Sequence, residues 1–150
     1  TKEGLFRRAT ARYLETYAAP TVELLSTDSS DGVVEFTRNL MRGLATLYTT
    51  KGQPRGCAIF QSGGSGSPSD SRACAITQGL KHGIEQGIRK RFESFASRGE
   101  KLSASPRTLA QFVVSVLCGI SQLASDGANR KELFKVVEHT ARSCVASGTA

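Results

Sequence analysis

The amino-acid sequence predicts an all-α protein, and two observations support this prediction. Apolar residues recur at steps of three and four along most of the chain, which is the spacing of one face of an α-helix. No stretch alternates apolar and polar residues convincingly enough to indicate a sheet. We therefore expect a helical bundle of about six helices, and the length of the chain is typical of one compact domain that spans 1–150.

The first expected helix spans about 2–17, where apolar and aromatic residues recur with helical spacing. Pro20 should end or bend it, because proline lacks a backbone donor and clashes with the preceding turn. A second helix is expected over about 31–49, with apolar residues on one face and arginines on the other. The segment 56–61 is expected to form a further, short helix.

The longest expected helix spans about 71–98, where the apolar stripe repeats with charged residues covering the solvent side. Arg98 and Gly99 are typical of a basic last turn followed by a left-handed cap. Before this helix, Ser62–Ser69 is rich in glycine and serine, a composition that indicates a surface linker.

The last two helices are expected over about 106–123 and 129–145. Ser105 is the expected N-cap of the first, with Pro106 at its first position, and Asn129 is the expected cap of the second. Both helices are apolar over a wider arc than a single core face requires. Such a pair can bury its surplus apolar surface against a second copy in a dimeric four-helix bundle.

Composition excludes several classes of protein. The 150 residues contain 20 Lys+Arg and 13 Asp+Glu, giving a net charge of +7, and apolar residues make up 39%. The most apolar stretch, 109–124, is too short to span a membrane and contains polar residues, so we expect no membrane association. The four cysteines form no C-x-x-C pair, which favours reduced, buried thiols in a cytoplasmic protein over a zinc or disulfide site.

Catalytic signatures are weak. The glycine- and serine-rich segment lacks the Lys-Ser/Thr ending of a P-loop, and Ser67 stands where a nucleophile elbow around Ser65 would need glycine. His82 and His139 are isolated from each other and from any carboxylate pair suited to acid–base catalysis. We therefore predict that the chain is not an enzyme and holds neither a metal nor a cofactor.

Basic residues are densest at Arg89–Arg91, a run that is typical of the solvated face of a helix. No interleaved aromatic residues suggest stacking on single-stranded nucleic acid, and no helix-turn-helix is evident within the 150 residues. The sequence alone therefore indicates no sequence-specific DNA reader.

Short motifs distributed along the chain resemble the TetR/AcrR family of bacterial transcriptional regulators. These motifs are Lys2-Glu3-Gly4-Leu5-Phe6 followed by Tyr13 and Tyr17, Pro54-Arg55-Gly56-Cys57-Ala58-Ile59, Leu117-Cys118-Gly119-Ile120, Ala124-Ser125-Asp126-Gly127-Ala128 and Lys131-Glu132-Leu133. They follow the family's order over nearly the whole chain. The resemblance implies a C-terminal ligand-binding and dimerisation domain, in which 1–18 is the helix that follows the DNA-binding helix-turn-helix.

From this resemblance we expect the family's N-terminal helix-turn-helix to be missing from this sequence, because Thr1 falls about where it would end. The resemblance therefore implies that double-stranded DNA is a partner only through that absent domain. It further implies a regulator, expected to be a repressor, that releases DNA on binding a small hydrophobic or aromatic ligand. The expected dimer interface consists of Leu109, Val113, Leu117, Ile120, Leu133, Val136, Val137 and Thr140.

Apolar and aromatic side chains on the inward stripes are the candidates to line a ligand cavity. They are Tyr13, Tyr17, Phe36, Leu40, Leu44, Phe60, Ile84, Ile88, Phe112 and Val116. Each could equally be an ordinary core residue, since any helical bundle needs such a stripe. Two other classes of function stay open, namely a stand-alone helical dimeric interaction module and an all-α enzyme that depends on His82 or His139.

Overall fold

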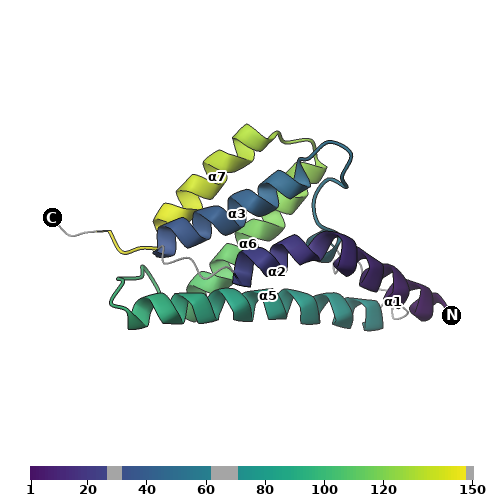
Figure 1. Cartoon of the computed structure of the whole chain (residues 1–150), viewed down its shortest axis with the longest axis horizontal. Helices are drawn as coiled ribbons and strands as arrows, with labels where there is room; N and C mark the ends of the chain where they lie inside the picture. Colours follow the sequence, from purple (N-terminus) through teal and green to yellow (C-terminus); the bar gives the residue numbers. More distant parts are fainter. Residues whose placement is uncertain (27–31, 62–70, 148–150) are drawn as a thin grey trace.

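The computed structural model describes residues 1–26, 32–61 and 71–147, and all the secondary-structure elements of these ranges are helices joined by loops and turns (Figure 1). The elements are α1 (Lys2–Tyr13), a π-helical turn η1 (Leu14–Ala18), α2 (Ala19–Ser26), α3 (Val33–Tyr48), α4 (Ala58–Gln61), α5 (Ser71–Ser97), α6 (Pro106–Ser125) and α7 (Arg130–Ser143). The expected all-α class is confirmed. The Ser62–Ser69 linker lies outside the described residues.

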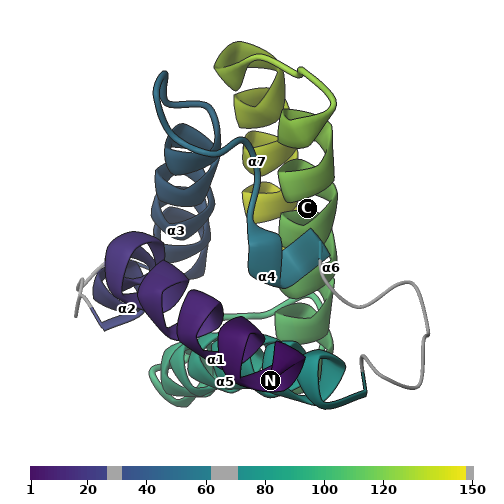
Figure 2. The ribbon, with the colours of Figure 1, turned by 90° about the vertical axis from the view of Figure 1, so that its right-hand side faces the viewer.

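Helices α3, α6 and α7 form one packed group, and the long helix α5 runs beneath it against α6 (Figures 1 and 2). Phe36 of α3 packs edge-on to Phe92 and also against Phe95, both from α5, with ring centroids 6.1 and 5.7 Å apart. Glu138 of α7 accepts hydrogen bonds from Arg38 and pairs with Arg42, which ties α7 to α3. The core of the protein lies among these four helices.

Local capping signals fix the ends of the last three helices. The Ser105 side chain accepts a hydrogen bond from the Thr108 amide at 3.1 Å, directly before Pro106. Asn129 and Glu132 form a reciprocal capping box at the start of α7. Gly99 ends α5 with φ +92°, a left-handed conformation that glycine adopts without steric cost. These three expectations are confirmed.

The N-terminal helix differs from the expectation. It does not stop at Pro20 but continues through η1 into α2, as far as Ser26. Pro20 is the second residue of α2 and directly follows the π-helical turn, whose wider winding accommodates a residue that has no backbone N–H. The expected bend is therefore a π-helical turn, a feature that is frequent at functional sites.

Helix α6 is the one helix in the described ranges that is long and apolar enough to cross a membrane by composition alone. Seven of its residues are buried within the bundle, among them Val113 and Leu117. Core helices of ordinary globular proteins meet the same criterion, so this property carries little weight.

Candidate ligand-binding cavity

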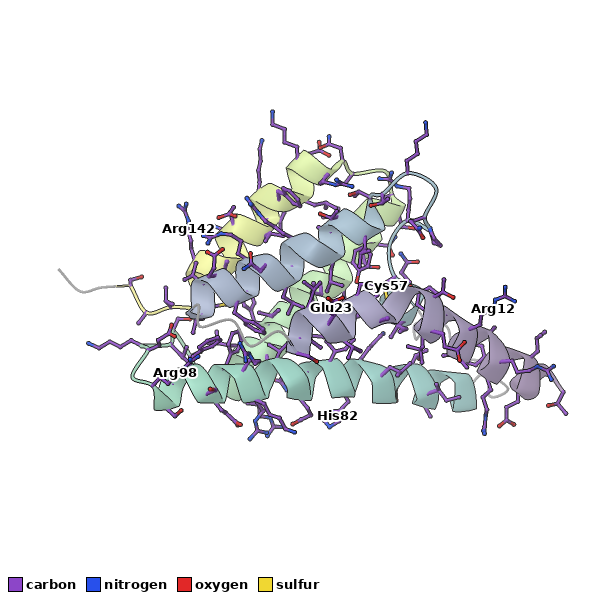
Figure 3. The ribbon with its side chains drawn as sticks, viewed as in Figure 1. Arg12, Glu23, Cys57, His82, Arg98 and Arg142 are labelled. Carbon is purple, nitrogen blue, oxygen red and sulfur yellow. The ribbon has the colours of Figure 1, made fainter. Side chains whose placement is uncertain are left out.

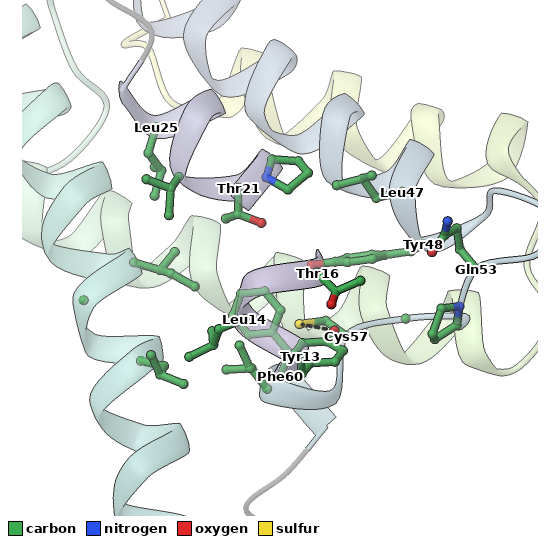
Figure 4. Close-up of a pocket in the computed structure, with 18 of the residues that line it drawn as sticks. Tyr13, Leu14, Thr16, Thr21, Leu25, Leu47, Tyr48, Gln53, Cys57 and Phe60 are labelled. Atoms are coloured by element: carbon green, nitrogen blue, oxygen red, sulfur yellow. Dashed lines mark hydrogen bonds between the residues drawn. The ribbon is translucent and has the colours of Figure 1, made fainter. Parts of the chain in front are cut away.

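A cavity of about 530 Å³ lies between the N-terminal helices and the remainder of the bundle (Figure 4). Five segments form its wall: α1 with η1 and α2, the end of α3, the α3–α4 loop, α4, and the middle of α5. The residues that line it are Tyr13, Leu14, Thr16, Pro20, Thr21, Val22, Leu25, Leu47, Tyr48, Thr50, Gln53, Pro54, Gly56, Cys57, Ile59, Phe60, Gly79, Leu80, Gly83 and Ile84. Its size is typical of a small-molecule site.

No lining residue carries a formal charge at neutral pH: the described wall is apolar except for phenol, hydroxyl, thiol and amide groups. Two of the wall's hydroxyls already donate to the backbone carbonyl four residues before them. Thr16 donates to the Arg12 carbonyl at 2.8 Å, and Thr50 donates to the Thr46 carbonyl at 2.6 Å. The wall therefore suits an uncharged ligand with a largely apolar surface.

Two tyrosines converge on one cysteine at the inner end of the cavity (Figure 4). The Tyr13 hydroxyl donates to Cys57 Sγ at 3.5 Å and accepts from the Ala58 amide at 3.2 Å. Burial raises the pKa of the Tyr48 phenol, and a hydrogen bond to the Cys57 thiol and the neighbouring Tyr13 phenol raise that pKa further. Tyr48 is consequently a neutral O–H group throughout the physiological pH range.

Space for the cavity comes partly from missing side chains on α5. Gly79 and Gly83 are one helical turn apart, and both line the cavity. A Cβ at either position would meet no atom within 4 Å, apart from those of its own chain neighbours and helix backbone. One turn further on, a Cβ at Gly87 would contact Leu25 of α2 at 3.6 Å. A glycine every fourth residue thus opens the face of α5 beneath α1 and α2.

The wall formed by α4 and the preceding loop is fixed to α6. The Cys57 amide donates to Ser121 Oγ at 2.7 Å, and Arg55 Nε donates to the Ala124 carbonyl at 2.7 Å. Gly56 has φ +78°, and a Cβ there would lie 2.6 Å from the Ser121 carbonyl oxygen. Glycine is therefore required at position 56 for both its conformation and its close approach to α6.

The structure brings three of the ten predicted ligand residues to the cavity: Tyr13, Phe60 and Ile84. Four others are buried in the core on α3 and α5, and these are Phe36, Leu40, Leu44 and Ile88. Phe112 is exposed on α6, Val116 is partly buried there, and the side chain of Tyr17 lies outside the described residues. The glycine spacing on α5 is the sequence signal that could have located the cavity.

The predicted dimer-interface residues also lie differently from the expectation. Leu109, Val113, Leu117, Ile120, Leu133, Val137 and Thr140 are buried inside the protomer, and Val136 alone of the eight is exposed. These residues occupy the centre of each apolar stripe, which faces the protein's own core. Phe112 and Leu123, at the edge of the α6 stripe, are large exposed apolar residues and were not in the predicted interface set.

His82 and His139 are both exposed and lie on different helices, α5 and α7. Figure 3 shows His82 pointing away from the body of the protein, whereas Cys57 lies within it. Within 1–26, 32–61 and 71–147, no group of three His, Cys, Asp or Glu residues could hold a metal ion.

Comparison with known proteins gives one consistent class. No protein-family model matches the chain. The HTH-type transcriptional repressor ComR of Escherichia coli K12 is 29% identical over 143 residues, which cover 94% of this chain and 67% of ComR. A cysteine-substituted variant of the TetR family transcriptional regulator CifR, solved with 26-base-pair double-stranded operator DNA, is 28% identical. It superimposes with a TM-score of 0.85 over 95% of this chain and 74% of CifR.

The chain has the fold of a TetR-family regulator. A second cysteine-substituted CifR variant with operator DNA matches at 27% identity and a TM-score of 0.85. A protein from Rhodococcus sp. RHA1 described as a TetR transcriptional regulator has the same fold, with a TM-score of 0.67 at 23% identity over 98% of this chain. The chain thus spans about two thirds of ComR and three quarters of CifR, and the proteins it resembles are transcriptional regulators rather than enzymes.

Proposed function

We propose that the chain is the effector-binding and dimerisation part of a cytoplasmic TetR-like transcriptional repressor. The observation that carries this proposal is the likeness to CifR over 95% of the chain, because CifR was solved on operator DNA. ComR is named a transcriptional repressor, which supports repression rather than activation as the proposed role. The uncharged cavity is the proposed effector site, and a small hydrophobic or aromatic molecule is the proposed effector.

The proposed dimer uses the outer face of α6 and α7. Phe112 and Val136 are each 37% exposed and Leu123 is 45% exposed, although all three are large apolar side chains. Burying such a face against its own copy would complete a four-helix bundle with twofold symmetry. The residues proposed for contact are therefore these three, rather than the buried stripe on the same helices.

Effector binding is proposed to act through α1. This helix contributes Tyr13 to the cavity, and it begins at Lys2, on the side where the resemblance places the DNA-binding domain. An effector that favours one arrangement of α1 would alter the spacing of two DNA-reading domains in a dimer, and with it their fit to successive major grooves.

The dimer is tested by sedimentation equilibrium of the chain and of the variant Phe112→Glu. We expect a dimer for the unmodified chain at tens of micromolar protein and a monomer for the variant, because a buried unpaired carboxylate opposes association. Leu5→Glu is the matched control, since Leu5 is an exposed apolar residue on α1, away from the proposed face. A monomeric unmodified chain would contradict the proposal.

DNA binding is tested with the proposed repressor, in which a helix-turn-helix domain precedes this sequence. Selection from a random double-stranded library should enrich an inverted repeat, because a twofold dimer reads two related half-sites. Compounds that bind the cavity should lower the affinity for the enriched sequence. If the library yields no enriched sequence, the role in transcription is rejected, whatever the oligomeric state.

A further inference from the structure

The Tyr13 hydroxyl joins α1 to α4. Tyr13 is the last residue of α1, and its hydroxyl accepts from the Ala58 amide, the first residue of α4, at 3.2 Å. The same hydroxyl donates its proton to Cys57 Sγ at 3.5 Å. These two bonds cross from the N-terminal helix to the wall that is fixed on α6, and both lie at the surface of the cavity.

The bond to sulfur is the weaker of these two contacts, because a thiol is a poor hydrogen-bond acceptor. A carbonyl, ether or alcohol oxygen in the cavity would be a better acceptor for the same O–H. The bond from Ala58 is compatible with such an exchange, because a phenol oxygen can accept from an amide while donating its own proton. A ligand can therefore take over the Tyr13 proton without displacing the Ala58 contact.

The surroundings of this hydroxyl restrict the ligand's charge. Among the described residues, the lining contains no lysine, arginine, histidine or carboxylate, so a charged ligand would lose its hydration there without gaining a counter-ion. The Thr16 and Thr50 hydroxyls already donate to the carbonyls of Arg12 and Thr46. The Tyr13 hydroxyl donates to sulfur, a weak acceptor, so an incoming oxygen can take this proton at little loss.

We propose that the effector is an uncharged, largely apolar molecule with one hydrogen-bond-accepting oxygen, and that this oxygen takes the Tyr13 proton from Cys57. The inference rests on the proposed effector role of the cavity and specifies both its ligand class and its trigger. When the Tyr13 proton turns to the ligand, α1 loses its bond to Cys57. The contact between the helix proposed to move and the wall fixed on α6 is thereby weakened.

Four benzene derivatives of similar size test the ligand class, with binding followed by amide chemical shifts in two-dimensional NMR. Acetophenone presents an acceptor oxygen, ethylbenzene presents none, benzoate is an anion and benzylammonium is a cation. We expect saturable binding of acetophenone and ethylbenzene, with the Ala58 and Cys57 amides shifting strongly only for acetophenone. Benzoate and benzylammonium should show no saturable binding in the same concentration range, because the wall offers no compensating charge.

Two substitutions with opposite expected effects test the trigger. Tyr13→Phe removes the donor and should weaken acetophenone about three- to tenfold, the value of one neutral hydrogen bond, while ethylbenzene binds as before. Cys57→Ala removes the competing acceptor and should tighten acetophenone about two- to threefold relative to ethylbenzene, by the same reasoning. Because Cys57→Ala retains Tyr13, it remains informative if Tyr13→Phe fails to fold. Thr16→Val is the control for loss of a wall hydroxyl, and the acetophenone-to-ethylbenzene ratio should stay unchanged.

The outcomes separate this inference from the proposed function. If Tyr13→Phe leaves the acetophenone-to-ethylbenzene ratio unchanged, or if the charged probes bind as well as acetophenone, the inference is overturned while the effector cavity stands. If none of the four probes binds the unmodified chain at millimolar concentration, both the inference and the effector role of the cavity are overturned. A ratio that falls in Tyr13→Phe and rises in Cys57→Ala supports the inference.

Discussion

The two sides of the cavity are built from helices of similar apolar spacing, yet they differ in how firmly they are held. Helix α3 has eight buried residues, whereas no described side chain from 1 to 26 is buried. Leu5 is 63% exposed and Val22 is 61% exposed. The α4 side is fixed through Ser121 and Arg55, while the α1–α2 side lies over glycine positions of α5. A firm wall facing a lightly packed one is an arrangement in which a bound molecule can move one side only.

The largest expected difference between the two sides is in their share of folding stability. Leu40→Ala removes a fully buried side chain from α3 and should lower the free energy of unfolding by about 2–5 kcal/mol. Leu5→Ala makes the same chemical change on α1, where the side chain is mostly exposed, and should cost less than about 0.5 kcal/mol. Urea denaturation measures both, and equal losses would remove the distinction between the two sides.

The link between the α4 wall and α6 gives the next largest effect. Ser121→Ala leaves the buried Cys57 amide without its 2.7 Å partner, so stability should fall by about 1–3 kcal/mol. Ser115→Ala is the matched control on α6, because that hydroxyl is exposed and bonds only the Gln111 carbonyl of its own helix. A loss in Ser121→Ala no greater than in Ser115→Ala would show that the wall is held by other contacts.

The elements that could be predicted from the sequence are those whose signals are local. Two helix starts are marked in this way, one by Ser105 with Pro106 and the other by the capping box of Asn129. A cap of this kind accepts a hydrogen bond from a backbone amide of the first helical turn, so its signal lies within three residues. The η1 turn and α2 were missed because proline is usually a stop signal, and whether it ends a helix depends on how the preceding turn is wound.

The lining of the cavity was harder to predict, for a physical reason. Core and cavity residues are both apolar, so the sequence pattern points to the centre of each apolar stripe. Side chains at the centre, such as Leu40 and Ile88, pack in the core. The cavity is lined by residues that flank the centre of a stripe, such as Leu47 and Leu80, and by glycines, which have no side chain. The same difference between the centre and the edge of a stripe explains why Phe112, not Val113, lies on the exposed face of α6.

Alkaline pH should weaken the cavity's inner end through Tyr48. Its folded-state pKa is raised above the unfolded value of about 10, so its stabilising contribution is complete below that pH and declines as the pH rises above it. Above pH 10 the unfolding free energy of the unmodified chain should fall faster than that of Tyr48→Phe, by up to about 1.4 kcal/mol per pH unit. Denaturation midpoints from pH 8 to 11 measure this slope, and parallel curves for the two proteins would contradict the assignment.

The smallest expected change in stability is also the sharpest test of the open face of α5. Gly83→Leu places a side chain where a Cβ meets open space, and it replaces glycine within a helix, so stability should rise by about 0.5–1 kcal/mol. Because the leucine occupies the cavity beneath α1 and α2, ethylbenzene binding should be lost. Gly119→Ala, on α6 and outside the cavity, should bring a similar gain while leaving binding intact. If Gly83→Leu alone gains stability and loses ethylbenzene binding, the space at position 83 is kept open for a ligand at the expense of folding stability. If Gly83→Leu still binds ethylbenzene, the binding site lies elsewhere.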